Sequence, residues 1–61
     1  MRVEVYDVYS EQTQAFSGEP EQVRQQLLAH YNFLKRYENA SLTEDLAALS
    51  RQQAYFVEVK Q

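Results

Sequence analysis

The stretch from Pro20 to Tyr37, PEQVRQQLLAHYNFLKRY, holds the longest helix-spaced apolar pattern in the chain. The pattern is made by residues at spacings of four, four and three, namely Val23, Leu27, Tyr31 and Leu34. Residues at these spacings lie on one side of an α-helix. We therefore predict a helix that packs this stripe against the rest of the chain. It ends either after Tyr31, where Asn32 interrupts it, or at Tyr37.

The start of this helix is clearly marked. Gly18 is the only glycine, and it stands where the chain must turn and where a positive φ suits glycine alone. Pro20 follows at the first helical position, where its missing N–H is not needed. Glu19 and Glu21 place negative charge at the positive end of the helix dipole.

A second helix is predicted to begin at Ser41-Leu42-Thr43-Glu44, which has the form of a capping box. Leu42, Leu46 and Leu49 continue it as a narrow apolar stripe. Only Glu38, Asn39 and Ala40 separate the two helical patterns. A connection this short predicts an antiparallel helix pair.

Three segments have the composition of strands. Residues 3–9, VEVYDVY, and residues 54–60, AYFVEVK, are rich in valine and aromatic residues and alternate with polar ones. Residues 14–17 form a short strand, joined to the first by a polar loop at residues 10–13. The alternation changes phase between Val5 and Tyr6, which predicts either a bulge or partial cover on both faces.

These elements predict a single α+β domain over residues 1–61, in the order strand, strand, helix, helix, strand. An antiparallel helix pair returns the chain to the end of the sheet where the first strand began, so the last strand runs parallel to the first. We therefore expect a three-stranded mixed sheet with the first strand in the centre. Both helices pack on one face of it.

The small size of the chain bears on its stability. Of its 61 residues, 44% are hydrophobic and 25% are charged, which is typical of globular proteins. A domain of this size buries only about 60% of its unfolded surface. With no cysteine and one histidine, neither a disulfide nor a structural zinc site is expected. We therefore expect a homodimer or another protein partner to supply the missing burial.

Charge and hydropathy argue against a nucleic-acid-binding protein and against a membrane protein. The formal net charge is −3, which argues against a nucleic-acid binder. No stretch approaches the ~20 apolar residues that cross a bilayer, and the basic start is not followed by a signal-peptide core. We expect a soluble cytoplasmic protein that binds no metal, cofactor or membrane.

The uncovered face of the predicted sheet is the first candidate site. On the strand assignment it displays the apolar residues Tyr6, Val8 and Phe56 among the charged residues Arg2, Glu4, Glu58 and Lys60. Aromatic anchors with a charged rim are typical of protein interfaces. Tyr6, Val8, Phe56 and Glu58 are therefore the predicted interface residues. The alternative is an ordinary solvated face with scattered aromatic residues.

The second candidate follows His30, where aromatic and basic residues interleave. It consists of Tyr31, Phe33, Lys35, Arg36 and Tyr37. Stacking rings beside cations are the pattern that binds single-stranded nucleic acid. The structural alternative is that Tyr31, Leu34 and Tyr37 face the core while the two cations are solvated.

No catalytic arrangement is visible in the sequence. His30 is the only histidine, and no patterned carboxylate or nucleophile accompanies it. We expect it to be partly buried and hydrogen-bonded, and we expect no enzyme activity. The sequence therefore predicts a small protein-binding or regulatory module that acts through self-association or a larger protein partner. The alternative is a nucleic-acid-binding protein that uses residues 30–37.

Overall fold

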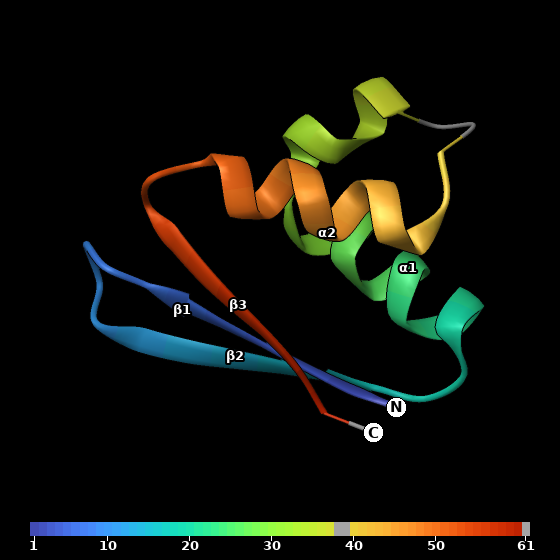
Figure 1. Ribbon diagram of the computed structural model, residues 1–61, viewed down its shortest axis with the longest axis horizontal. Coiled ribbons are helices and arrows are strands. Elements are labelled where there is room, and N and C mark those ends of the chain that lie inside the picture. Colours follow the sequence, from blue (N-terminus) through green and yellow to red (C-terminus); the bar gives the residue numbers. More distant parts are fainter. Residues whose placement is uncertain (38–39, 61) are drawn as a thin grey trace.

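The computed structural model describes residues 1–37 and 40–60, with only the backbone of Tyr37. The elements are strands β1 (Arg2–Asp7) and β2 (Gln12–Ser17), helix α1 (Pro20–His30), the 3-10 helix η1 (Asn32–Tyr37), helix α2 (Leu42–Arg51) and strand β3 (Tyr55–Lys60). Both α-helices lie on one face of a three-stranded sheet, so the fold is α+β (Figure 1).

The sheet has the order β2-β1-β3, and every neighbouring pair of strands is antiparallel. The hairpin loop has the predicted four residues but lies two residues earlier, at positions 8–11. The carboxylate of Asp7 fixes it, because its Oδ1 accepts hydrogen bonds from the N–H groups of Tyr9 (2.8 Å) and Ser10 (3.3 Å). A shift of two residues leaves every side chain on its predicted face.

The change of phase in β1 does not produce a bulge. The pairing of β1 with both neighbours is continuous from Arg2 to Asp7. Val3 and Val5 are buried under the helices, at 0% and 1% exposure, while Tyr6 lies on the opposite face. The apolar alternation therefore changes phase because Tyr6, a half-buried aromatic residue, lies on the face without helices.

The apolar stripe of α1 continues past the end of the α-helix. The helix closes when the Tyr31 N–H donates to the Leu27 carbonyl (2.8 Å), and η1 begins at the next residue. Leu34 N–H then donates to the Tyr31 carbonyl (3.0 Å). Residues three apart eclipse each other in a 3-10 helix, so Tyr31 and Leu34 stay on one side and both are buried. Residues 33–37 are thus neither irregular nor α-helical.

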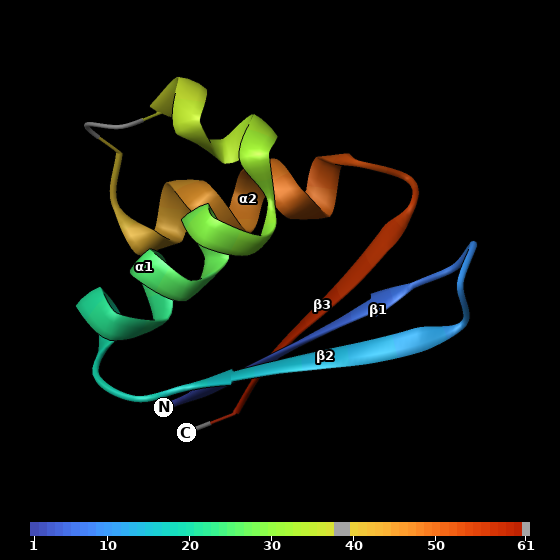
Figure 2. The ribbon, with the colours of Figure 1, turned by 180° about the vertical axis from the view of Figure 1, so that it is seen from behind.

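The predicted antiparallel helix pair is wrong, and so is the mixed sheet that it implied. η1 carries the chain back, so that α1 and α2 both run from right to left in Figure 1 and from left to right in Figure 2. The ion pair between Arg24 Nε and Asp45 Oδ2 (2.9 Å) joins the N-terminal halves of the two helices. The chain therefore leaves α2 at the far end of the sheet, and β3 returns antiparallel to β1.

The short connection that suggested the antiparallel pair falls at residues 38–40, of which 38 and 39 lie outside the described residues. The capping box that follows is confirmed. Glu44 N–H donates to Ser41 Oγ and Ser41 N–H donates to Glu44 Oε1, both at 3.3 Å. α2 therefore begins where its sequence signal places it.

Gly18 is required by its own conformation and by the cap of α1. Its φ is +135°, which L side chains rarely adopt. The Glu19 N–H donates to Gln22 Oε1 (2.8 Å) at the start of the helix. A Cβ on Gly18 would lie 2.6 Å from that same oxygen.

Gly18→Ala should therefore lower the free energy of unfolding by roughly 1–3 kcal/mol, because it adds backbone strain and displaces the Gln22 side chain. Urea denaturation followed by circular dichroism measures the change. Gln22→Ala is the control, since it removes the cap and leaves the backbone unstrained. A loss in Gly18→Ala no greater than that in Gln22→Ala would contradict the strain argument.

Candidate functional site

The sheet face opposite the helices carries an exposed aromatic pair. Tyr6 of β1 and Phe56 of β3 are direct cross-strand partners. Their rings are stacked, with centroids 6.4 Å apart and planes inclined by 27°. Phe56 is 65% exposed, although a phenylalanine is among the residues most often buried. The stacked pair thus presents apolar surface that no described residue covers.

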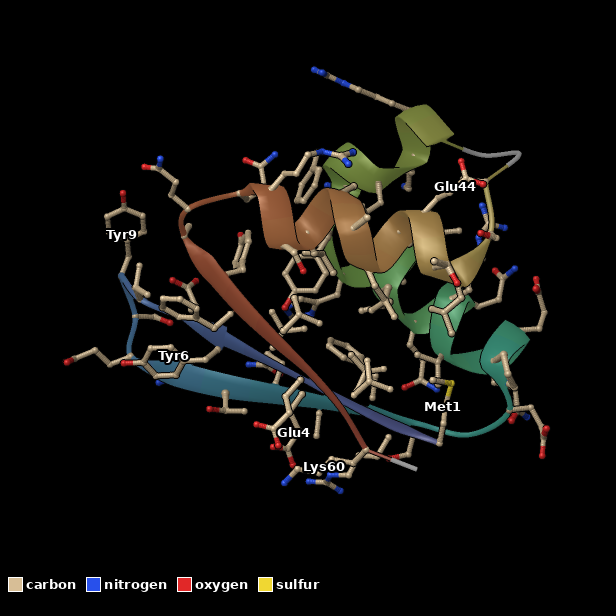
Figure 3. The ribbon with its side chains drawn as sticks, in the orientation of Figure 1. Met1, Glu4, Tyr6, Tyr9, Glu44 and Lys60 are labelled. Carbon is tan, nitrogen blue, oxygen red and sulfur yellow. The ribbon has the colours of Figure 1, made fainter. Side chains whose placement is uncertain are left out.

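A charged cluster occupies the same face toward the chain ends, where Figure 3 shows Glu4 beside Lys60 and Tyr6 farther along β1. Glu4 accepts from Arg2 Nε through Oε2 (2.9 Å) and lies 3.4 Å from Lys60 Nζ through Oε1. Lys60 Nζ also lies 3.5 Å from Glu58 Oε1. The hydrogen bond from Arg2 and the contact with Lys60 lower the pKa of Glu4, and the same contact raises the pKa of Lys60. Two cations and two anions leave the cluster with no net charge.

A shallow groove of about 240 Å³ lies on this face. Its lining residues are Glu4, Tyr6, Thr13, Phe56, Val57 and Glu58. Pockets that hold cofactors or drug-sized ligands measure roughly 300–1,000 Å³. The groove is therefore smaller than a small-molecule site and has the volume for one or two side chains of a partner.

The structure brings three of the four predicted interface residues together, since Tyr6, Phe56 and Glu58 all line the groove. Val8 does not join them. It follows the end of β1, is half-buried, and its N–H donates to the Ala54 carbonyl (2.9 Å). Thr13 also lines the groove. It was not predicted there, because the sequence pattern placed it in the hairpin loop.

The aromatic and basic residues after His30 do not form one surface. Tyr31 is only 7% exposed, and its ring packs edge-on against Phe16 (6.0 Å) and Tyr55 (5.3 Å). This burial raises the pKa of Tyr31 to about 12. Phe33 is half-buried and stacks on Tyr55, with centroids 6.5 Å apart.

The cations of this segment point the other way. Lys35 and Arg36 are exposed on η1, whereas Tyr31 and Leu34 lie in the core. This arrangement agrees with the structural alternative for the segment. The side chain of Tyr37 lies outside the described residues.

His30 is exposed, so the expectation of partial burial is wrong. Its ring contacts Tyr31 (4.6 Å) and Phe16 (5.6 Å) edge-on at the end of α1. Among residues 1–37 and 40–60 no group of three or more His, Asp or Glu side chains could hold a metal ion. No helix in those two ranges is long and apolar enough to span a membrane.

The ion pair between the helices was not foreseen. Asp45 is fully buried at 0% exposure, and its Oδ2 accepts from Arg24 Nε at 2.9 Å. Its Oδ1 has no hydrogen-bond partner among the described residues. Burial raises the pKa of Asp45 more than the Arg24 charge lowers it, and Glu44 and Glu21 raise it further. In the sequence, Asp45 only resembled an ordinary acidic residue in the first turn of a helix.

The raised pKa predicts how stability depends on pH. Because the folded-state pKa exceeds the unfolded value of ~3.9, the protonated form is favoured in the folded state. The resulting stabilisation is present below pH ~4 and is lost as the pH rises through the folded-state pKa. The free energy of unfolding of the native chain, minus that of Asp45→Asn, should therefore fall as the pH rises above ~4.

Urea denaturation of both proteins across this range measures the difference. Glu11→Gln, at an exposed carboxylate of the hairpin loop, serves as the control for general charge effects. A difference that grows with pH would mean that attraction to Arg24 outweighs the cost of burying the charge.

Comparison of the chain with protein-family models, characterised proteins and solved structures gives no match.

Proposed function

We propose that the chain is a non-catalytic protein-binding module whose working surface is the open sheet face. The observation that carries this proposal is the stacked Tyr6 and Phe56 pair on a face without helices. Aromatic residues dominate binding energy at protein interfaces because they bury a large rigid area. The expected partner is a protein that places apolar side chains on this pair.

The free energy gained by covering the Phe56 side chain is large enough for this residue to anchor a partner. Covering its 65% exposed surface would remove roughly 130 Å² from water, which contributes about 3 kcal/mol. That is the size of effect seen at binding hot spots, where single residues contribute ~2 kcal/mol or more. The groove beside the ring offers space for a side chain of the partner.

The charge of the rim also suits a protein partner. Arg2, Glu4, Glu58 and Lys60 cancel in formal charge and already pair with one another. A neutral, internally paired rim gives no strong attraction to a polyanion such as nucleic acid. Binding through this face should therefore depend little on salt concentration.

Tyr6→Lys and Phe56→Lys should each abolish binding to the partner, because they place a charge where apolar surface must be covered. Tyr9→Lys is the matched control. Tyr9 is 85% exposed at the tip of the hairpin, away from the Glu4–Lys60 end of the face (Figure 3). Circular dichroism checks that all three variants keep the fold.

The measurement is quantitative mass spectrometry of proteins retained by the tagged chain from lysate of its own source, after nuclease treatment. A partner retained by the native chain and Tyr9→Lys, but lost from both face variants, supports the proposal. Retention by all variants contradicts it. A bound fraction removed by nuclease would favour the exposed Lys35 and Arg36 instead.

A further inference from the structure

The direction of the backbone groups along β3 follows from one hydrogen bond. Val8 N–H donates to the Ala54 carbonyl (2.9 Å), and this pair continues the register of Tyr6 with Phe56. In an antiparallel ladder, residue pairs that hydrogen-bond to each other alternate with pairs whose backbone N–H and C=O groups point away from the partner strand. Phe56, Glu58 and Lys60 therefore bond to β1. The backbone groups of Tyr55, Val57 and Val59 point to the free edge of the sheet.

This free edge of β3 is open. Tyr55 N–H is used, since it donates to the Gln52 carbonyl (3.1 Å). Within the described part of the chain, no backbone hydrogen bond reaches Val57 or Val59 from the side away from β1. β3 lies in front in Figure 1, and among the described residues it is the last strand on its side of the sheet. Val59 belongs to the helix-side face yet is 42% exposed.

The other edge of the sheet is polar and is covered at one end. By the same alternation, Thr13, Ala15 and Ser17 of β2 point outward, because Gly18 N–H and the Met1 carbonyl (3.1 Å) form a bonded pair. Gln26 Nε2 of α1 donates to the outward carbonyl of Ser17 (2.9 Å). β2 is polar, with the sequence QTQAFS, whereas β3 reads YFVEVK. Proteins commonly block one edge by such polar and covering groups.

We propose that β3 pairs antiparallel with β3 of a second copy of this chain, about a two-fold axis at Val57. Each Val57 N–H then donates to the Val57 carbonyl of the other copy. Each Val59 N–H donates to the Tyr55 carbonyl of the other copy. Val57 and Val59 together have four unpaired backbone N–H and C=O groups, and these bonds use three of them. The Tyr55 N–H keeps its hydrogen bond to the Gln52 carbonyl.

Side chains favour this register over those centred on Glu58 and Val59. Centred on Val57, the pairing sets Val57 against Val57 and Tyr55 against Val59, and aromatic with β-branched pairs are favourable across strands. Phe56 then lies opposite Glu58. A register centred on Glu58 would set two carboxylates directly opposite each other, which is destabilising. A register centred on Val59 would leave the first half of each β3 unpaired.

Charge also favours a second copy at this edge. β3 contains one Glu and one Lys, which pair at 3.5 Å, so the strand is neutral within a chain of net charge −3. Two copies can therefore meet along β3 without bringing net charge together. The dimer has a six-stranded sheet whose outer edges are both β2. Because β2 is polar and its Ser17 carbonyl is already bonded, we expect assembly to stop at two copies.

The area buried between the two copies determines how tightly they associate. A strand of six residues is about 20 Å long, and the molecule is 16 Å thick along its shortest axis. Such a contact falls at the small end of protein interfaces, below ~1,200 Å² in total. The dimer is therefore expected to form reversibly with rising concentration.

The first test compares proline on the two edges. Val57→Pro removes a donor that the dimer needs, while an edge strand tolerates proline where the N–H faces solvent. Ala15→Pro places the same lesion on the outward side of β2. Sedimentation equilibrium should give twice 7.2 kDa at high concentration for the native chain and for Ala15→Pro, and 7.2 kDa for Val57→Pro. A native chain that stays monomeric, or a Val57→Pro chain that still dimerises, overturns the proposal.

The second test does not depend on the stability of a proline variant. The chain has no cysteine, so Phe56→Cys and Glu58→Cys, both exposed, can be mixed and oxidised without background. The Val57-centred pair predicts a disulfide between the two different variants. Cross-linking of Glu58→Cys with itself, or of neither variant, contradicts the proposed register.

Different variants test the proposed dimer and the proposed binding by the open sheet face. Tyr6 is on the central strand, so Tyr6→Lys should remove partner binding and leave the mass of the dimer unchanged. Val59→Pro removes the other donor of the strand pair at a residue outside the groove, so it should do the reverse. If Tyr6→Lys abolishes dimerisation, copies associate through the sheet face and the edge pairing is wrong.

Discussion

The packing of one apolar stripe onto the central strand determines the rest of this small structure. Val23, Leu27 and Leu34 are completely buried, as is Val3 of β1 beneath them. After Tyr31 the chain changes from α-helix to 3-10 helix, and Leu34 remains in that core. This change turns the chain back across the top of the domain. The shared direction of the two helices and the antiparallel placement of β3 both follow from it.

Local signals in the sequence determined the elements, but not the path between them. Gly18 with Pro20 and the Ser41–Glu44 capping box placed both helix starts correctly, because each acts within one turn of backbone. The direction of α2 was mispredicted for a physical reason. A spacing of three, as between Tyr31 and Leu34, fits one side of either helix type, so periodicity alone cannot reveal where one replaces the other.

The candidate site was predictable where it rests on strand alternation. Tyr6, Phe56 and Glu58 fall on one face for any register shifted by two residues, which is why the misplaced loop did not matter. The burial of Asp45 could not be predicted in the same way. An acidic residue in the first turn of a helix is favourable in water, and only the approach of Arg24 from α1 makes a buried position tolerable.

Helices that run the same way also place both of their N-termini at one end of the molecule. Glu19, Glu21, Glu44 and Asp45 gather there with Arg24 as the one cation on the same turns, for a formal charge of −3. That equals the charge of the entire chain, so the formal charges of all other residues cancel. The net formal charge of the side chains thus lies where the two helices begin. Two copies that approach each other through these helix ends bring like charges together, which disfavours association there.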